Sequence, residues 1–396
     1  MLDLVTDGPN QGQPGNQPPP AARGPRVMLL GSGELSRELA IALRRLGATV
    51  IAADARADAP AHGVADEALV VPLTDGDELT RAVQRVRPDF VVTTTRAVAV
   101  DALERLGAGP AELVPGARSV RLTADRESLR RLAADELGLP TAPFWFVGSA
   151  DELEAVGSHA GYPLLVRPAA GRGRSVVSGP GDIAPAWQRA GARRVLAETV
   201  VEVESSVTLL LVRTEGPHGP VIDFCSPIGH DDGDAPESWQ PQPMSAAAMD
   251  SARSIAARIV KALGGRGVFG VELMINGDEV YFADVSARPR GSAWVTVRSQ
   301  RLSAFELQAR AILGLPVDTM MISPGAARAI VASPGGGAPT AAALGGALGV
   351  PESDLRLFGP SSGKLGVALA TAPEVGAARD RARQVATALN VPDSRG

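Results

Sequence analysis

The sequence predicts an α/β protein in which a parallel, doubly wound unit is followed by a strand-rich remainder. Three observations predict this class. A strand-helix-strand pattern begins at Arg26, hairpin-like pairs of strands dominate from about residue 144, and hydrophobic residues make up 45% of the 396 residues. A chain of this length and hydrophobicity can bury two to three separate cores.

The composition excludes several classes of function. The formal net charge of −5 gives no general attraction to nucleic acid or to an anionic membrane, so anions must be bound at local sites. Cys225 is the only cysteine, which excludes an internal disulfide framework and fits a reducing compartment. No apolar run approaches the length of a bilayer span, and the N-terminus lacks the pattern of a signal peptide. We therefore expect a cytoplasmic protein.

The parallel unit is predicted over residues 26–122. Residues 1–25 are rich in Pro, Gly, Gln and Asn and are expected to form a disordered leader. The stretch 26–54 then gives a strand, a glycine turn, an amphipathic helix that stops at Gly47, and a second strand. More strands follow, with a helix between them over 77–86. These strands are predicted at 68–71, 89–94 and 112–115.

The remainder begins with a helix over 125–140. The strand-rich region reaches residue 322 and ends with a helix over 303–313. A smaller strand-rich unit is predicted over 323–396, closed by a helix at 373–389. The strands are expected at 144–147, 163–167, 175–179, 194–198, 206–212, 220–226, 326–333, 354–359 and 365–371, with a hairpin over 267–286.

The glycine turn is the first candidate site. It offers Gly31 and Gly33, but Ser36 replaces the third glycine of a dinucleotide fingerprint, while Asp54 lies about twenty residues beyond, where a ribose-binding acid would lie. A nicotinamide-dependent oxidoreductase is therefore weakly indicated. Two other interpretations stay open: an anion bound at the start of the helix, and a tight turn that simply requires glycine.

The hairpin carries two acids that point to magnesium. With a three-residue loop, Glu272 and Asp284 are directly opposite, with Cβ atoms about 5 Å apart. A two-residue loop puts them on opposite faces unless a bulge restores the parity. Two adjacent carboxylates need a cation between them, and hard oxygens suit Mg²⁺. A solvated acidic pair is the alternative.

Two further stretches are consistent with a nucleotide. A strand, Arg167 and a glycine-broken loop in sequence are typical of a site that holds phosphate. The strand that ends at Glu198 continues into Val200 and Val201, an apolar hinge that could hold a flat base such as adenine. An ordinary buried strand with acidic ends explains the second stretch equally well.

In order along the chain, "ADRESLRRLAADELGLPT", "PLLVRPAAGRGRS", "AETVV", "GVFGVEL" and "YFADVSARP" resemble an ATP-grasp protein. Together with "RVMLLGSGELSRELA", "ESWQPQPMS" and "LSAFELQARAILGLPV", they resemble the formate-dependent phosphoribosylglycinamide formyltransferases of purine synthesis over residues 26–390. The resemblance implies a Rossmann-like N-terminal domain over 26–122, a two-lobed ATP-grasp domain over 123–322 and a small C-terminal domain over 323–396.

The resemblance also implies a reaction and its participants. Formate is phosphorylated by Mg-ATP, and the amine of glycinamide ribonucleotide attacks the formyl phosphate, in a family that is usually homodimeric. Arg288 would be catalytic, and Glu272 and Asp284 would bind Mg²⁺. ATP would be held by Arg126, Arg167, Gly171, Gly173, Glu198, Thr199, Val200, Val201 and Glu204. The ribonucleotide would be held by Glu34, Leu35 and Lys364.

Several positions depart from the family pattern. Arg167 replaces a lysine, and Ser206 replaces a ribose-binding glutamate for which Glu204 could partly substitute. On the acceptor side, Thr94 and Gly291 replace acids. The family's arginine pair is here Gly363 and Lys364. Such losses weaken ribonucleotide binding. The alternative is thus a diverged ATP-grasp carboxylate–amine ligase, or a nucleotide-binding protein without turnover.

Overall fold

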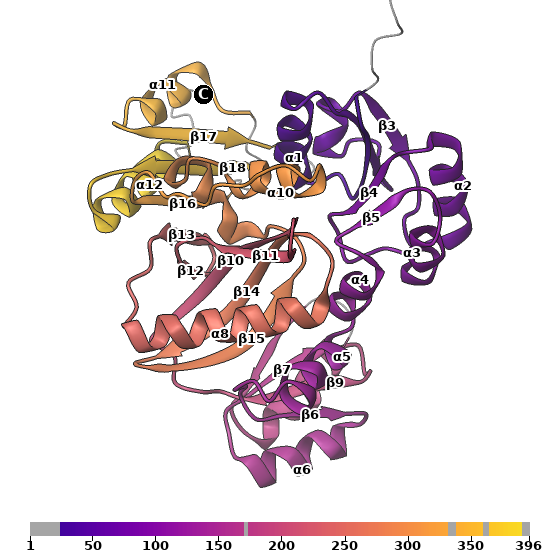
Figure 1. Ribbon diagram of the computed structural model, residues 1–396. Helices are drawn as coiled ribbons and strands as arrows, with labels where there is room; N and C mark the ends of the chain where they lie inside the picture. Colours follow the sequence, from indigo (N-terminus) through magenta and orange to yellow (C-terminus); the bar gives the residue numbers. More distant parts are fainter. Residues whose placement is uncertain (1–23, 170–172, 332–337, 359–363, 390–396) are drawn as a thin grey trace, which may run out of the picture.

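The computed structural model describes residues 24–169, 173–331, 338–358 and 364–389 (Figure 1). Gly171 and nearly all of the predicted leader lie outside these described residues. Figure 1 shows a parallel N-terminal domain, a small antiparallel lobe, and a large sheet that continues into the C-terminal strands. The predicted α/β class is confirmed.

The N-terminal domain is a five-stranded parallel sheet with the order β3-β2-β1-β4-β5. Its strands are β1 (Arg26–Leu30), β2 (Thr49–Asp54), β3 (Glu67–Val70), β4 (Phe90–Thr93) and β5 (Glu112–Val114). Its helices are α1 (Glu34–Arg45), η1 (Pro60–Gly63), α2 (Gly76–Val86) and α3 (Val100–Gly107). The strand order reverses between the parallel neighbours β1 and β4, so the glycine turn after β1 lies at the point where ligands bind in such sheets.

The core of this domain explains the apolar run in β1. Met28 and Leu30 belong to one buried cluster, whereas Val27 and Leu29 belong to another on the opposite face. Helices therefore cover both faces, as the sequence of a parallel strand predicts. The linker that follows consists of α4 (Ala117–Ala124), α5 (Arg126–Arg131) and η2 (Leu132–Glu136).

The small lobe is a four-stranded antiparallel sheet with the order β6-β9-β7-β8. It contains β6 (Phe144–Val147), α6 (Ala150–Ala160), β7 (Leu164–Pro168), β8 (Ser175–Val177), η3 (Pro180–Asp182), α7 (Ile183–Arg189) and β9 (Val195–Thr199). Its helices pack on one face through residues such as Leu153 and Trp187. The sheet carries Arg167 on β7 toward the large sheet.

The large sheet has nine antiparallel strands in the order β15-β14-β10-β12-β13-β16-β18-β17, with β11 on β10. Its strands are β10 (Ser205–Gly216), β11 (Gly219–Phe224), β12 (Ile228–Asp231), β13 (Glu237–Gln240), β14 (Gly267–Asn276), β15 (Glu279–Ser286), β16 (Gly325–Ile330), β17 (Ser353–Leu357) and β18 (Gly366–Thr371). The helices are α8 (Ala246–Leu263), η4 (Gly291–Val295), α9 (Thr296–Ser299), α10 (Ala304–Ile312), α11 (Ala341–Leu348) and α12 (Val375–Leu389).

Helices cover both faces of this sheet. Leu209 and Leu211 of β10 pack in one cluster with α8, and Leu210 and Val212 pack in another with α10. Helix α10 also contacts the N-terminal sheet, because its Ile312 shares a cluster with Leu29. This double contact explains why seven of the nine residues of α10 are buried.

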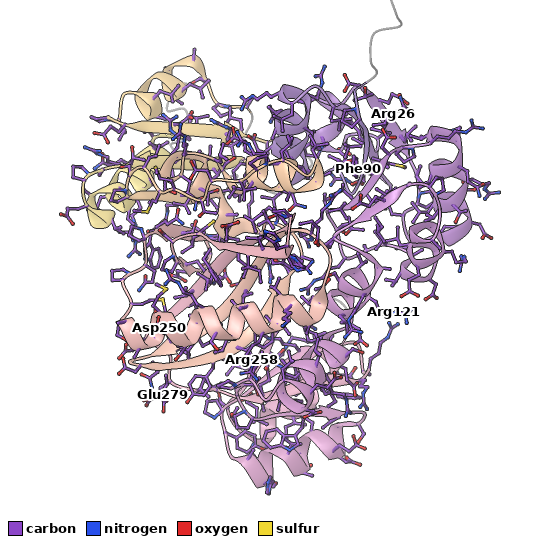
Figure 2. All side chains as sticks on the ribbon, viewed as in Figure 1. Arg26, Phe90, Arg121, Asp250, Arg258 and Glu279 are labelled. Atoms are coloured by element: carbon purple, nitrogen blue, oxygen red, sulfur yellow. The ribbon has the colours of Figure 1, made fainter. Side chains whose placement is uncertain are left out.

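Further contacts join the N-terminal domain and the linker to the large lobe. Arg118 Nε donates to the Ala262 carbonyl at 3.0 Å, and Ser119 Oγ donates to the Gly264 carbonyl at 2.9 Å. Arg258, labelled in Figure 2, donates to the carbonyl of Leu137 and so ties α8 to the end of η2. Among the described residues, no helix is long and apolar enough to cross a membrane.

Candidate active site

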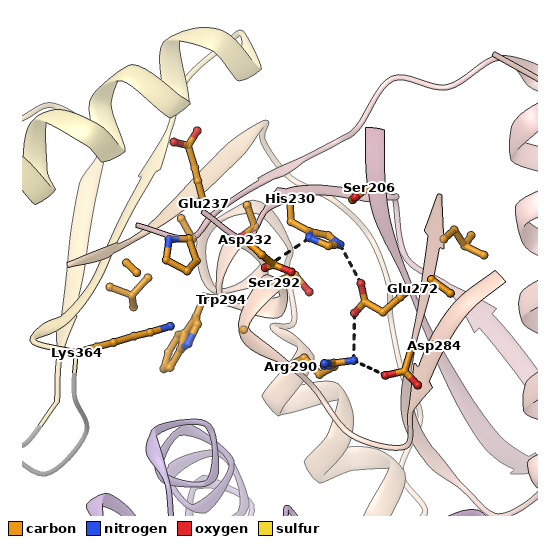
Figure 3. A pocket seen from close by; sticks show the side chains of 18 of the residues that line it. Ser206, His230, Asp232, Glu237, Glu272, Asp284, Arg290, Ser292, Trp294 and Lys364 are labelled. Atoms are coloured by element: carbon orange, nitrogen blue, oxygen red, sulfur yellow. Dashed lines mark hydrogen bonds and ion pairs between the residues drawn. The ribbon is translucent and has the colours of Figure 1, made fainter. Parts of the chain in front are cut away.

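A cavity of about 380 Å³ lies where the small lobe faces the large sheet and the C-terminal strands. Arg167 and Arg174 line it from the small lobe, Glu272 and Asp284 from the large sheet, and Lys364 from the C-terminal part. Figure 3 shows the two acids and Lys364 around this space. The cavity thus combines cations and carboxylates from three parts of the fold.

Glu272 and Asp284 lie directly opposite each other on β14 and β15. Asn276 pairs with Glu279, so the loop has only two residues, and a shift in register between Glu272 and Leu273 restores the parity. The three-residue loop is therefore wrong, and the bulged alternative is confirmed. The bulge is what turns both carboxylates to the same side.

The donor set of this acid pair fits Mg²⁺. Both carboxylates are hard oxygen ligands, their side chains are 16% and 23% exposed, and both line the cavity. No group of three or more potential metal ligands was found among the described residues. Two carboxylates are nevertheless sufficient for Mg²⁺, which usually completes its octahedron with water and substrate phosphates.

Two arginines flank the acid pair. Arg290 Nη1 lies 3.1 Å from Asp284 Oδ2 and 3.9 Å from Glu272 Oε1. Arg96 Nη2, from the loop after β4, lies 3.1 Å from the same Asp284 oxygen. Burial alone would raise the pKa of Asp284, but Arg96 and Arg290 together hold it below its ordinary value.

His230 of β12 approaches the second acid. Its Nε2 lies 2.9 Å from Glu272 Oε2, as a charge contact without the alignment of a hydrogen bond. Burial disfavours the charged imidazole, but Glu272 outweighs this and raises the pKa of His230. Thr208 Oγ1 donates to the same Glu272 oxygen at 3.1 Å and lies 2.9 Å from Ser292 Oγ. These contacts fix the orientation of Glu272.

On the side of the small lobe, Arg167 lines the cavity, whereas Arg126 does not. Arg126 donates to the carbonyl of Pro168, and its burial lowers its pKa below the ordinary value. Arg167 Nε lies 3.8 Å from Glu198 Oε2. Glu198 is buried, and its carboxylate forms its main ion pair with Arg130 inside the protein. Gly173 has a φ of 115°, which suits a tight loop.

The predicted adenine-binding stretch lies away from the residues that line the cavity. The amide of Thr199 donates to Pro143 O at 3.0 Å and that of Val200 to Pro163 O at 3.3 Å, while Val200 is half exposed. Glu204 Oε2 accepts from the amide of Gly277 at 3.1 Å. Glu198, Thr199, Val200, Val201 and Glu204 do not line the cavity that holds the acid pair.

The predicted acceptor residues meet near the glycine turn. Leu35 and Thr94 line one small cavity of about 20 Å³ together with Arg288, the predicted catalytic residue, which does not line the cavity of the acid pair. Glu34 begins α1 beside the small cavity. The hydroxyl of Thr94 lies 2.6 Å from Gly31 O, so it braces the turn. Lys364 lies instead in the large cavity.

Asp54 also has a local role in the turn. Its Oδ2 accepts from the amide of Ser32 at 2.7 Å, and its Oδ1 accepts from the amide of Arg56 at 3.1 Å. Asp54 therefore holds the glycine turn closed. These two hydrogen bonds explain the presence of Asp54 without a bound ribose.

Several residues of the site were not identified from the sequence. Arg96, Arg174, His230, Arg290 and Glu237 all lie at or beside the acid pair or its cavity. Arg174 belongs to the arginine-rich loop after Arg167, so the sequence pattern could have identified it as a residue of the site. Arg96 and His230 come from distant segments with no recognisable motif.

Two family models match the chain in order. Residues 25–124 match the ribonucleotide synthetase preATP-grasp domain, and residues 132–305 match the ATP-grasp domain. With the small lobe facing the large sheet across one cavity, these matches define the class. The protein is an ATP-grasp protein with an N-terminal preATP-grasp domain.

Curated relatives narrow this class. The formate-dependent phosphoribosylglycinamide formyltransferase of Rhodococcus jostii is 48% identical over 389 residues, which are 93% of this chain and 96% of the relative. That of Paraburkholderia xenovorans is 47% identical over 382 residues, 92% of this chain and 95% of the relative. The chain belongs to the formate-dependent phosphoribosylglycinamide formyltransferase family.

Solved structures agree with this assignment. A structure of glycinamide-RNase-transformylase T from Mycobacterium tuberculosis has 65% sequence identity and a TM-score of 0.82, covering 92% of this chain and all of that one. An N5-carboxyaminoimidazole ribonucleotide synthetase from Thermotoga maritima has a TM-score of 0.81 at 22% identity, covering 92% and 99% of the two chains. The second likeness shows the fold alone.

Proposed function

We propose that this protein transfers a formyl group from formate to glycinamide ribonucleotide, using ATP. The observation that carries the proposal is the placement of Glu272 and Asp284 side by side in one cavity with Arg167 and Arg174. Acids that can hold a metal and guanidiniums that can hold phosphate are what phosphoryl transfer requires. The family of the chain then supplies the substrates.

The proposed reaction has two steps. A formate oxygen attacks the γ-phosphorus of ATP, the bond to the bridging oxygen breaks, and ADP leaves. The amine of the ribonucleotide then attacks the formyl carbon, phosphate leaves with the C–O bond electrons, and the nitrogen loses a proton. Formyl phosphate hydrolyses readily, so the reaction requires the two lobes to shield it from water.

The residues of this chain have distinct proposed roles. Arg167 and Arg126 would balance the charge of the phosphate tail, with Gly173 allowing the backbone of the loop to approach it. The adenine base would be flanked by Glu198, Thr199, Val200 and Val201. Glu204 would reach the ribose only if its carboxylate gave up the hydrogen bond from the Gly277 amide.

Glu272 and Asp284 would hold Mg²⁺, which would neutralise charge on the transferring phosphoryl group when bound. The electrostatics of the cavity suit an anionic substrate. Arg96 and Arg290 hold the pKa of Asp284 below its ordinary value, so this proposed metal ligand is ionised near neutral pH.

The acceptor would be bound near the glycine turn. Glu34, Leu35 and Arg288 lie there, and Lys364 contributes the cation of the C-terminal part. The acceptor side nevertheless has Thr94 and Gly291 where the family pattern has acids. We therefore expect a Michaelis constant for the ribonucleotide above that of a chain with both acids.

ADP release tests the proposal. Purified protein is incubated with ATP and Mg²⁺, with formate and glycinamide ribonucleotide added singly and together, and the formylated product is followed by NMR. We expect fast ADP release and product only when both substrates are present. ADP release that needs formate but is indifferent to the ribonucleotide would instead favour a carboxylate–amine ligase with another acceptor.

We also propose a homodimer that works in the cytoplasm. The family habit supports the dimer, and the single buried thiol of Cys225 is consistent with a reducing compartment. Size-exclusion chromatography with light scattering tests the dimer, since a monomer at micromolar concentration contradicts it.

A further inference from the structure

Arg290 lies between the two acids that are proposed to hold the metal. Its guanidinium is 3.1 Å from Asp284 Oδ2 and 3.9 Å from Glu272 Oε1, and Figure 3 shows it bridging them. Of the two acids, Arg96 pairs with Asp284 alone and His230 with Glu272 alone. Among the described residues, Arg290 is thus the cation with ion pairs to both acids.

The acid pair is already neutralised without a metal. Glu272 and Asp284 carry two formal negative charges, and Arg290 and Arg96 carry two positive ones, so the four side chains sum to zero. Each carboxylate of the acid pair therefore has a positive partner within the protein.

A divalent metal cannot simply join this arrangement. Mg²⁺ bound to both carboxylates would lie within a few ångströms of the guanidinium, and like charges at such distances repel strongly in a partly buried site. The carboxylate oxygen nearest Arg290 would also have to give up its hydrogen bond. Arg290 is 38% exposed and borders the open cavity, so its long side chain has space to move away.

We propose that Arg290 is an internal counter-ion that occupies the metal position in the nucleotide-free protein and leaves it when the metal–nucleotide complex binds. The phosphate tail offers the displaced guanidinium a new anionic partner. Metal alone therefore binds poorly, and metal and nucleotide bind cooperatively. The inference rests on the proposed metal site.

Binding of Mn²⁺ to the nucleotide-free protein tests the inference. Free Mn²⁺ is followed by EPR during titration of the wild type, of Arg290→Gln and of Arg298→Gln. Arg298 is a matched control, since it is 45% exposed and pairs with Asp354 away from the cavity. We expect Arg290→Gln to bind Mn²⁺ at least tenfold more tightly than the other two proteins. Equal affinity in all three overturns the inference.

Thermal unfolding provides a second readout. Without metal, Arg290→Gln leaves two carboxylates opposite each other with one guanidinium fewer, so it should melt below the wild type. Mn²⁺ should raise the melting temperature of the variant and so remove the difference. Mn²⁺ alone should leave the wild type unchanged. If Arg290→Gln melts like the wild type in the absence of metal, Arg290 is not a counter-ion.

A titration with a non-hydrolysable ATP analogue separates this inference from the proposed function. The wild type should then bind Mn²⁺ tightly, because the analogue gives Arg290 another partner. If neither protein binds Mn²⁺ even with the analogue, the acid pair is not a metal site, and the proposed function fails together with the inference. Tight binding in every condition overturns the inference alone.

Discussion

At the scale of single residues, Glu272 is the side chain whose charge the proposed function needs most. Glu272→Gln keeps the shape and the contact with Thr208 but removes one of the two charges. We expect ATP to bind the wild type more tightly with Mg²⁺ than without it, and the variant to lose this difference. Isothermal titration calorimetry measures both affinities.

Glu279→Gln is the matched control for this experiment. Glu279 lies on the same hairpin, is exposed at its turn, and accepts a hydrogen bond from Tyr281 at 2.8 Å. Its substitution should leave the metal dependence intact. A wild type whose affinity for ATP is the same with and without Mg²⁺ would count against the metal site.

Gly291 is the second informative residue, because the family pattern has an aspartate there. A Cβ at Gly291 would meet no atom within 4 Å, and the residue lines the large cavity. We expect Gly291→Asp to lower the Michaelis constant for glycinamide ribonucleotide several-fold with a smaller effect on kcat, since it adds a binding contact.

The matched control is Gly376→Asp, which also has open space but lies on α12. An unchanged Michaelis constant in Gly291→Asp would show that this position does not contact the acceptor.

The sequence predicted the acid pair but not its surroundings. Glu272 and Asp284 belong to one hairpin, so local spacing limited their geometry to two alternatives. Arg96 and His230 reach the same acids from the loop after β4 and from β12, across 188 and 42 residues of sequence. Such contacts depend on tertiary packing, which no local pattern encodes.

At the scale of elements, Glu237 joins the end of the large sheet to the last helix. It lies on β13, is 4% exposed, and accepts from Arg328 of β16 at 2.7 Å. Arg379 and Arg383 of α12 donate to it at 2.5 and 2.9 Å. One carboxylate thus holds β13, β16 and α12 together.

We expect Glu237→Gln to lower the free energy of unfolding by about 2–4 kcal/mol, because three guanidiniums lose their common counter-ion. Glu374→Gln, an exposed acid just ahead of the same helix, should change it by less than about 0.5 kcal/mol. Chemical denaturation of both variants measures the difference. Equal stability of the two variants would mean that the cluster does not stabilise the fold.

The contribution of Glu237 should depend on pH. Burial alone would raise the pKa of Glu237, but the hydrogen bonds from Arg379 and Arg383 lower it below the ordinary value of 4.5. A lowered folded-state pKa stabilises the fold fully above pH 4.5, and this stabilisation is lost as the pH falls below that value. The gap between wild type and Glu237→Gln should therefore narrow in acid.

Some elements could not be predicted from the sequence. Strands β12 and β13 are four residues each and carry His230, Glu237 and Gln240, so they lack an apolar pattern. Helix α8 was also missed, although Ser245 caps it and Gly264 ends it. The domain boundary at residue 322 remains a prediction.

At the scale of the whole molecule, the N-terminal domain contacts the large lobe closely where the backbone of Pro115 meets that of Gly265. A Cβ at Gly265 would lie 1.5 Å from Pro115 O, and Gly265 has a φ of +73°. Neighbouring Gly264 has a φ of +74° but no atom within 4 Å of such a Cβ. Both positions have a positive φ, which strains any residue other than glycine, but only Gly265 has a neighbouring atom that a methyl group would strike.

We expect Gly264→Ala to cost about 1 kcal/mol of stability from backbone strain alone. Gly265→Ala should cost about 2 kcal/mol more, because the N-terminal domain must shift to admit the methyl group. Thermal unfolding compares the two variants, and small-angle scattering detects the shift. Equal melting temperatures of Gly264→Ala and Gly265→Ala would show that the contact between Gly265 and Pro115 can adjust at no cost in stability.

The single ladder that runs from β15 to β17 limits how this chain can be shortened. Strands β16, β18 and β17 follow β13 by backbone pairing, so the large sheet continues without a break into the C-terminal strands. A gene truncated ahead of β16 would leave β13 with a bare row of amides and carbonyls. Such an unpaired edge can pair with strands from other copies of the chain. We therefore expect the truncated protein to aggregate into inclusion bodies when it is expressed.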